Sequence, residues 1–72
     1  MRNTQFPQLV KIMNERGETL KDIAKILGYS QNSKSQISRR LTGEIEFTIS
    51  DVEILCEHYN MDFWELFKRK EN

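Results

Sequence analysis

Two short apolar stripes with a polar turn between them occupy residues 20–43, and this pairing constrains the fold more than any other feature of the sequence. The first stripe repeats at the i, i+3, i+4 and i+7 positions of one helix face and is closed by Gly28. Its members are Leu20, Ile23, Ala24 and Leu27. The second stripe places Ile37 and Leu41 on one face of a second helix. Two short helices that each bury one face and are joined by a turn predict a helix-turn-helix unit over residues 19–43.

Helix-start signals precede four of the predicted helices. In each signal, Ser, Thr or Asp is followed three residues later by a side chain that can reach back to the cap's own N–H or favour the positive end of the helix dipole. The pairs are Thr19 with Asp22, Ser33 with Gln36, Thr48 with Asp51, and Asp62 with Glu65. With the apolar stripes they predict an all-α chain of five helices, at roughly residues 5–16, 20–27, 34–42, 49–59 and 63–69. Residues 44–47 are too short a segment for a strand and are expected to form a loop.

The remaining helices carry apolar stripes of the same kind. The expected core members outside the central unit are Phe6, Leu9, Val10, Met13, Ile49, Val52, Leu55, Cys56, Tyr59, Leu66 and Phe67. A chain of 72 residues lies near the lower limit at which an apolar core holds without disulfides or metals. The single cysteine, Cys56, excludes an internal disulfide, so we expect one domain over residues 1–72 that is held together by packing.

Several classes of protein do not fit this sequence. Its apolar runs are shorter than the ~18 residues that span a membrane, and it begins without the apolar segment of a signal peptide. The unpaired cysteine is typical of a reducing compartment, so we expect a cytoplasmic protein. His58 and Cys56 are two positions apart and point in different directions on a helix. We expect no enzyme activity, catalytic residue, metal, cofactor or small-molecule ligand.

The net charge of zero hides two halves of opposite sign. Residues 1–43 hold eight Lys or Arg and three Asp or Glu, a net charge of +5. Residues 44–72 hold three Lys or Arg and eight Asp or Glu, a net charge of −5. A basic half suits the approach to phosphates, whereas the acidic half would face away from them or meet a basic partner.

The motifs resemble the Cro/CI-type helix-turn-helix family, also called the XRE family. The likeness rests on TLKDIA at residues 19–24, LGYS at 27–30 and ISRRLTG at 37–43, and the closing helices at 49–66 are also similar. It implies a compact five-helix bundle of the lambda-repressor-like type and a transcriptional regulator that places its third helix in the major groove of double-stranded DNA. In size and general character the chain is similar to the small Cro-like and modulator-of-repression proteins of temperate phages.

The resemblance also implies which residues would contact DNA. Ser33 would cap the recognition helix, which is the helix that enters the major groove. Lys34, Ser35 and Gln36 would lie in its first turn, and Arg39 one turn further on the same exposed face. Lys, Arg and Gln are the side chains that pair with guanine and adenine edges. Arg40, Lys21 and Lys25 would contact phosphates, and the amide end of the second helix near Thr19 would seat another. The expected DNA-contacting residues are thus Thr19, Lys21, Lys34, Ser35, Gln36, Ser38, Arg39 and Arg40. The structural alternative for Arg39 and Arg40 is a solvated helix end that is favoured by the helix dipole.

Two departures from the family pattern leave a second function open. Six residues separate Ser30 from Ile37, a longer stretch than the family usually has. Either the turn is longer and Ser33 is the cap, or the helix begins near Ser30 and projects an extra turn. The loop after the recognition helix carries Glu44 and Glu46. These carboxylates would repel the DNA phosphates unless their side chains face away from the DNA.

The second hypothesis is an anti-repressor that binds a cognate CI-type repressor through the acidic half and alters its DNA binding. The expected interface residues are Glu44, Ile45, Glu46, Phe47, Phe63 and Trp64. The alternative for the three aromatic residues is that they close the core, but we expect at least one of them to be exposed. The last helix would also be the natural surface for a homodimer, which is the usual way to read a palindromic site.

Overall fold

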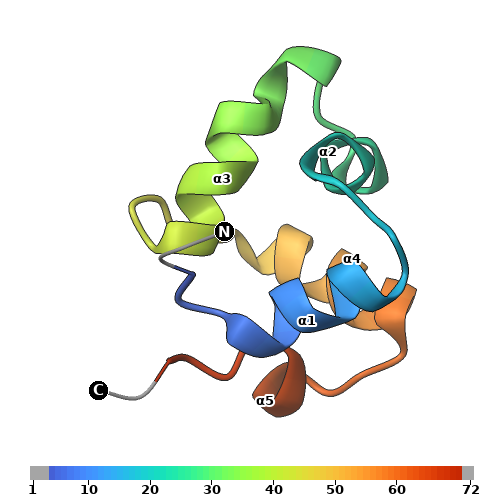
Figure 1. Ribbon diagram of the computed structural model, residues 1–72, viewed down its shortest axis with the longest axis vertical. Helices are drawn as coiled ribbons and strands as arrows, with labels where there is room; N and C mark the ends of the chain where they lie inside the picture. Colours follow the sequence, from blue (N-terminus) through green and yellow to red (C-terminus); the bar gives the residue numbers. More distant parts are fainter. Residues whose placement is uncertain (1–3, 71–72) are drawn as a thin grey trace.

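The computed structural model describes residues 4–70, and this part of the chain is all-helical (Figure 1). Its elements are α1 (Pro7–Glu15), α2 (Leu20–Leu27), the 3-10 helix η1 (Gln31–Ser33), α3 (Lys34–Thr42), α4 (Ile49–Tyr59) and α5 (Phe63–Leu66). No strand occurs within the described residues. The predicted all-α fold class is thereby confirmed, and the bounds of α2, α3 and α4 agree with those predicted from sequence.

Reciprocal capping boxes fix the starts of α2 and α4. Thr19 N–H donates to Asp22 Oδ2 at 2.9 Å, and Asp22 N–H donates to Thr19 Oγ1 at 3.4 Å. Thr48 and Asp51 make the same pair of bonds, at 3.2 and 3.1 Å. Each box satisfies two amides that the opening turn of a helix leaves without an intrahelical partner.

The other two expected caps are wrong. Neither Ser33 nor Asp62 makes a side-chain cap hydrogen bond within residues 4–70. Ser33 has φ −97° and ψ 14°, outside the extended region, because it is the last residue of η1, which runs directly into α3. A capping side chain reaches its amide from an extended backbone, so Ser33 cannot do so, and its Oγ lies 3.1 Å from Ser30 Oγ instead.

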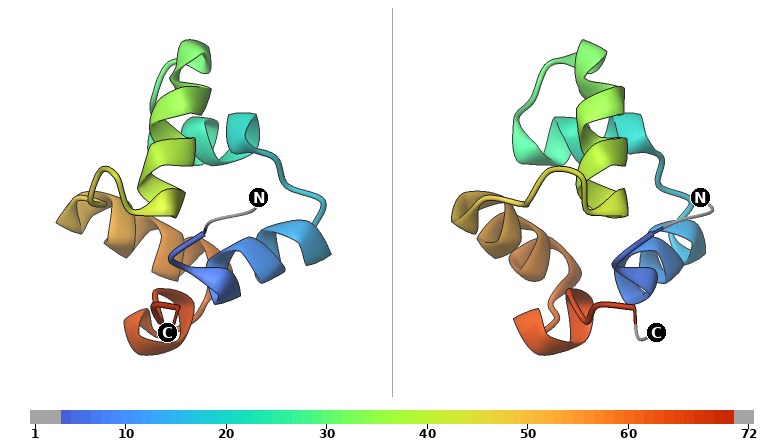
Figure 2. Two further views of the ribbon diagram at one scale, coloured as in Figure 1. Left: turned by 60° about the vertical axis from the view of Figure 1, so that its left-hand side comes forward. Right: turned by 90° about the vertical axis from the view of Figure 1, so that its left-hand side faces the viewer.

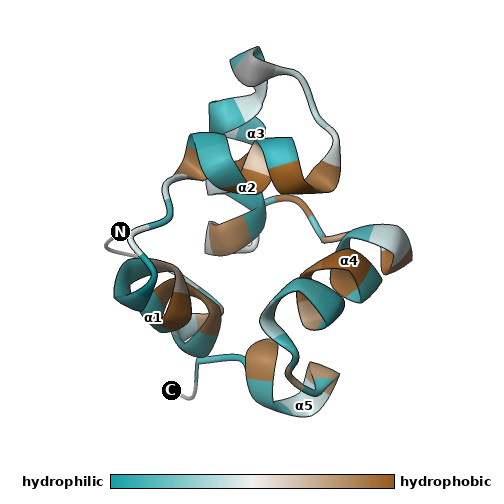
Figure 3. Cartoon of the chain, turned by 90° about the vertical axis from the view of Figure 1, so that its right-hand side faces the viewer, coloured by the Kyte–Doolittle hydropathy of each residue, from teal (hydrophilic) through white to brown (hydrophobic). Residues whose placement is uncertain are grey.

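The helices form two ends joined by α4. At one end α2 and α3 pack against each other, and at the other end α5 packs against α1 (Figures 1 and 2). Helix α4 contacts both α2 and α5, so it connects the two ends. Hydrophobic and hydrophilic residues alternate in patches along α1, α2 and α4, as amphipathic helices require (Figure 3).

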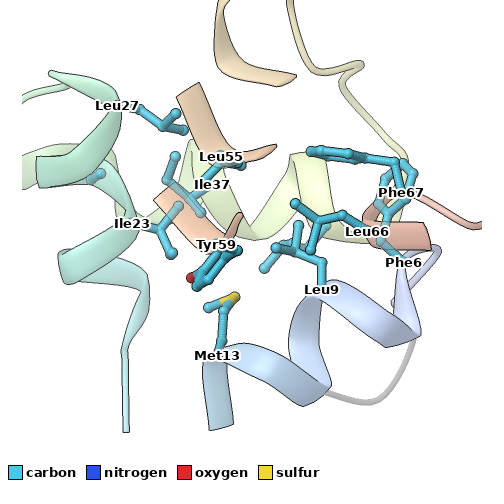
Figure 4. Close-up of a cluster of buried hydrophobic side chains, with 12 residues drawn as sticks. Phe6, Leu9, Met13, Ile23, Leu27, Ile37, Leu55, Tyr59, Leu66 and Phe67 are labelled. Atoms are coloured by element: carbon cyan, nitrogen blue, oxygen red, sulfur yellow. The ribbon is translucent and has the colours of Figure 1, made fainter. Parts of the chain in front are cut away.

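Each of the five α-helices contributes at least one fully buried side chain to a single core (Figure 4). The most deeply buried large residues are Leu9, Ile23, Ile37, Leu41, Leu55 and Leu66, all of which the sequence stripes predicted. Ile49 was also expected in the core, but this expectation is wrong because its side chain is 79% exposed. The buried face of α4 runs through Asp51, Leu55 and Tyr59, which places Ile49, two residues before Asp51, on another side.

The side chain of Glu18, in the turn between α1 and α2, contacts two residues in the last turn of α4. The hydroxyl of Tyr59 donates to Glu18 Oε1 at 2.7 Å, and His58 Nε2 lies 3.0 Å from Glu18 Oε2. Burial alone would raise the pKa of Glu18, but the hydrogen bonds with Tyr59 and His58 and the nearby charge of Arg16 outweigh this effect. The pKa of Glu18 therefore lies below its ordinary value of 4.5.

A lowered carboxylate pKa makes the stability of the fold depend on pH. The contribution of Glu18 is fully present above pH 4.5 and is lost as the pH falls through the lower pKa of the folded state. We expect the wild type to have a higher free energy of unfolding than Glu18→Gln at neutral pH, and the difference to shrink as the pH falls below 4.5. Urea denaturation at neutral and acidic pH measures this difference. If the difference persists in acid, the charge of Glu18 is not its source.

Candidate nucleic-acid interface

The connection between α2 and α3 contains an additional helical turn. Helix α2 ends at Gly28, whose φ of +82° is the left-handed conformation that glycine adopts most readily, and Tyr29 N–H donates to Ala24 O at 2.8 Å. After Ser30, η1 begins and continues without interruption into α3. The structure lies between the two alternatives that the sequence left open: α3 begins at Lys34 with Ser33 as its N-cap residue, and the 3-10 residues of η1 precede it directly after Ser30.

Helix α3 has a buried side and an exposed side. Ile37 and Leu41 are buried against α2 and the core, whereas four of the expected base-contacting side chains are exposed. These four are Lys34, Ser35, Gln36 and Arg39, while Ser38 is half-buried. The exposed set combines two cations, an amide and a hydroxyl, which together offer donors to guanine and both donor and acceptor to adenine.

Arg40 was expected to contact phosphates, but in the structure its side chain packs against other residues of the fold. Its side chain is only 12% exposed, and its guanidinium carbon lies 5.1 Å from the centre of the Tyr29 ring. Its Nε lies 3.6 Å from Asp51 Oδ2, and its Nη1 donates to Gln36 O at 3.3 Å. Arg40 therefore has a packing role in the structure, and its small exposed fraction does not favour the expected phosphate contact.

Helix α2 presents Lys21 and Lys25 to solvent beside the exposed side of the unit. The phosphate seat expected near Thr19 already holds a carboxylate, because Thr19 N–H and Oγ1 both contact Asp22 Oδ2. The hydrogen bonds from the backbone and side chain of Thr19 lower the pKa of Asp22, so this carboxyl is negatively charged at neutral pH. Thr19 is thus a weaker phosphate ligand than the sequence suggested, and the two lysines remain.

The loop after α3 and helix α5 form a second surface, in which Phe47 and Phe67 belong mainly to the core. The rings of Phe6, Phe47 and Phe67 pack edge to face at 5.2 to 5.5 Å. In contrast, Phe63 is 45% exposed and Trp64 is 82% exposed, which agrees with the expectation that at least one aromatic side chain faces solvent. Glu44 and Glu46 are exposed and Ile45 is half-buried.

A groove of about 180 Å³ runs between this loop, the start of α4 and helix α5. Its lining residues are Phe6, Gly43, Ile45, Glu46, Phe47, Val52, Phe63, Phe67 and Arg69. Four of the six expected protein-interface residues line it, and Glu44 and Trp64 are not among them. Most of its lining residues are apolar, and Glu46 and Arg69 add one carboxylate and one guanidinium.

The structure also brings together residues that sequence reasoning did not connect. The buried carboxylate of Asp51 accepts a hydrogen bond from the Tyr29 hydroxyl, with oxygen–oxygen distances of 2.8 and 2.7 Å. Burial and the neighbouring carboxylate raise the pKa of Tyr29. The capping signal with Thr48 already accounts for Asp51 in the sequence, so no sequence pattern indicates its second partner, Tyr29.

Within residues 4–70, no three His, Cys, Asp or Glu side chains gather closely enough to hold a metal ion. No helix in this part of the chain is both long and apolar enough to cross a bilayer. Burial raises the pKa of the Cys56 thiol, which disfavours the reactive thiolate.

Comparison of the chain with models of known protein families, with the curated proteins and with the solved structures finds no match. Function is therefore inferred from the chemistry of the two surfaces, one polar and basic on α2 and α3, the other apolar and acidic around α5.

Proposed function

We propose that the protein is a sequence-specific DNA-binding transcriptional regulator of the Cro/CI type, with a lambda-repressor-like fold, that inserts α3 into the major groove. The observation that supports this most strongly is the division of α3 into a buried side and an exposed side. Ile37 and Leu41 hold the helix on the core, while Lys34, Gln36 and Arg39 are free to reach base edges. An anchored helix with such side chains is what major-groove readout requires.

The additional turn formed by η1 would change which residues enter the groove first. When a helix-turn-helix protein binds DNA, the N-terminal residues of the recognition helix contact base edges. Because η1 extends α3 at that end, Asn32 precedes Lys34 toward the DNA, and its side chain is exposed. Asn pairs bidentately with adenine, so we include Asn32 among the base-reading residues.

Lys21 and Lys25 on α2 would contact phosphates and set the register of the protein on the duplex. The exposed carboxylates of Glu44 and Glu46 would lie beyond the end of α3, where they disfavour a second set of phosphate contacts. The interface would therefore be small, and two copies on a palindromic site would supply the missing affinity.

Binding to the DNA that flanks the protein's own gene, titrated across salt concentrations, tests the proposal. A protein that neutralises phosphates loses affinity with a slope of about −0.9 per phosphate in log affinity against log salt. We expect a discrete footprint with such a slope. Absence of binding at low salt would overturn the proposal.

A second candidate function is supported by the exposure of Trp64 and Phe63 beside the groove. We propose as this alternative that the protein is an anti-repressor that binds the DNA-binding surface of a cognate CI-type repressor. Exposed aromatic side chains are the usual anchors of protein interfaces, and the four carboxylates of Glu44, Glu46, Glu53 and Glu57 are exposed. A repressor surface that is basic enough to bind DNA would be their electrostatic complement.

Under this alternative, Trp64→Ala should weaken the complex with the repressor encoded beside this gene by about thirtyfold or more, because hot-spot aromatics contribute ~2 kcal/mol or more. Calorimetric titration of the two purified proteins measures the affinity. Ile54→Ala is the matched control, since Ile54 is also exposed and apolar but lies on α4 and not on α5. We expect Ile54→Ala to change affinity less than about fivefold.

The same variant separates the candidate functions. Trp64 lies on α5, at the end of the molecule opposite α3 (Figure 2), so Trp64→Ala should leave DNA affinity unchanged if one copy binds DNA by itself. A loss of DNA affinity that accompanies a loss of dimers in sedimentation would assign the α5 surface to a homodimer. Unchanged repressor affinity would exclude α5 as the partner site.

A further inference from the structure

Two clusters of similar composition occur in the fold, and each joins an arginine, a tyrosine and a carboxylate. The first, which we name the α3 clasp, consists of Tyr29, Arg40 and Asp51. The second, the α1 clasp, consists of Arg16, Glu18 and Tyr59. In both, the tyrosine hydroxyl donates to the carboxylate at 2.7 Å and the arginine lies over the tyrosine ring, at 5.1 Å in the α3 clasp and 5.0 Å in the α1 clasp.

The α3 clasp holds the helix-turn-helix unit at two places. Tyr29 lies in the turn between α2 and η1, and Arg40 lies in the last turn of α3. Both reach Asp51, which is 3% exposed and belongs to the first turn of α4. One carboxylate therefore connects the turn before α3 and the end of α3 to the helix beneath them.

The buried position of the Arg40 guanidinium depends on the negative charge of the Asp51 carboxylate. Among the described residues, Arg40 Nε is buried and has no hydrogen-bond partner, and its closest charged contact is Asp51 Oδ2 at 3.6 Å. A buried cation is costly unless an opposite charge lies nearby. Loss of the Asp51 charge would leave Arg40 buried with the Tyr29 ring and the Gln36 carbonyl as its remaining contacts. The side chain would then move toward solvent, and α3 would lose its second anchor.

We propose that Asp51 is a positioning residue that fixes the orientation of α3 through Tyr29 and Arg40, and that DNA sequence specificity depends on it. The inference rests on the proposed DNA-binding function. Bidentate contacts with base edges tolerate little misalignment, whereas contacts between flexible lysines and phosphates tolerate more. A change in the orientation of α3 therefore lowers affinity for the specific site and leaves non-specific binding in place.

Asp51→Asn tests the inference, because asparagine keeps the shape and can still accept from Tyr29 and Thr48 but carries no charge. Glu18→Gln is the matched control, since it neutralises the carboxylate of the α1 clasp, away from α3. The probes are a duplex selected from random DNA by the wild-type protein and an unrelated duplex of equal length. Affinities are measured at a temperature at which thermal denaturation shows all variants to be folded.

We expect Asp51→Asn to lower affinity for the selected duplex by about tenfold or more, the size of one lost base contact, and affinity for the unrelated duplex by less than about twofold. Glu18→Gln should keep the ratio of the two affinities, although it lowers the melting temperature. An unchanged ratio in Asp51→Asn, or an equal loss of it in Glu18→Gln, would overturn the inference.

Amide chemical shifts supply a readout that does not need DNA. In Asp51→Asn we expect shifts at residues 30–42 that extend to Lys34 and Ser35, which do not contact Asp51, and few shifts in α1. If the wild-type protein selects no DNA sequence, the proposed function fails, and the NMR result alone decides whether Asp51 orients α3. Shifts confined to the immediate neighbours of residue 51 would then count against it.

Discussion

Replacing Arg39 with glutamate is expected to lower affinity for the DNA site by about a hundredfold or more. Arg39 is exposed on α3, one turn beyond Ser35 on the same face of the helix, and is the arginine of this helix that remains free for base contacts. A good bidentate contact between arginine and guanine contributes ~1–3 kcal/mol of discrimination, and a factor of ten corresponds to ~1.4 kcal/mol. The carboxylate also adds repulsion toward the phosphates, so the two effects together exceed the loss of one contact.

The stability of the fold should change little in this variant. The exposed side chain of Arg39 contributes mainly through its favourable position near the C-terminal end of α3, an effect of ~0.3–1 kcal/mol. Circular dichroism should therefore show the same helical content as the wild type. This separates a loss of DNA contact from a loss of structure.

Lys68→Glu is the matched charge reversal, because Lys68 is also exposed but follows α5, at the opposite end of the bundle. Fluorescence anisotropy with the flanking DNA, at one fixed salt concentration, compares the two variants with the wild type. Equal losses in both would indicate that only net charge matters. Unchanged affinity in Arg39→Glu would show that α3 does not read the DNA.

The sequence predicted the elements whose signals agree with one another. Helices α2 and α4 have a capping pair and an apolar stripe that point to the same start, and both capping boxes form. Helix α3 has its stripe in Ile37 and Leu41 and ends at Gly43, which has a φ of +91°. Where local chemistry and burial specify the same bounds, short-range information is sufficient.

The remaining differences come from tertiary contacts that the sequence could not reveal. Arg40 has the appearance of a solvent-facing cation, and only its proximity to Asp51, eleven positions along the chain, makes it a packing residue. Ile49 continues an apolar stripe in the sequence, but at the start of α4 its side chain is 79% exposed. A 3-10 turn such as η1 has few residues and no characteristic apolar period. The sequence therefore leaves open whether residues 31–33 belong to the turn or to the start of α3.

The candidate interfaces were predictable in composition more than in geometry. The exposed residues of α3 follow from the positions of Ile37 and Leu41, since residues on the side of the helix opposite these two face solvent. The groove beside α5 does not follow in this way, because it depends on how Phe63 and Phe67 stack at 5.7 Å and on where the loop after α3 lies. From the sequence alone, each of these aromatic residues could belong to the core or to an exposed surface. The packing shows that Phe67 is buried and that Trp64 is exposed.

Leu41→Ala is expected to lower the free energy of unfolding by ~2–5 kcal/mol and to unfold much of the protein at growth temperature. Leu41 is fully buried, and its carbonyl accepts hydrogen bonds from Gln5 N–H at 2.7 Å and from the Thr4 hydroxyl at 3.2 Å. It therefore anchors α3 on the core and also fixes the segment that precedes α1. A domain of 72 residues has a small total stability, so a loss of this size removes a large part of it.

Ile49→Ala supplies the control for this prediction, because it also truncates a branched apolar side chain, but one that is 79% exposed. We expect it to change the free energy of unfolding by no more than ~0.5 kcal/mol. Urea denaturation followed by circular dichroism measures both variants under the same conditions. Equal losses would contradict the assignment of the buried faces. A loss confined to Leu41→Ala, with DNA binding lost in proportion to the unfolded fraction, would show that the core beneath α3 maintains the surface proposed to read DNA.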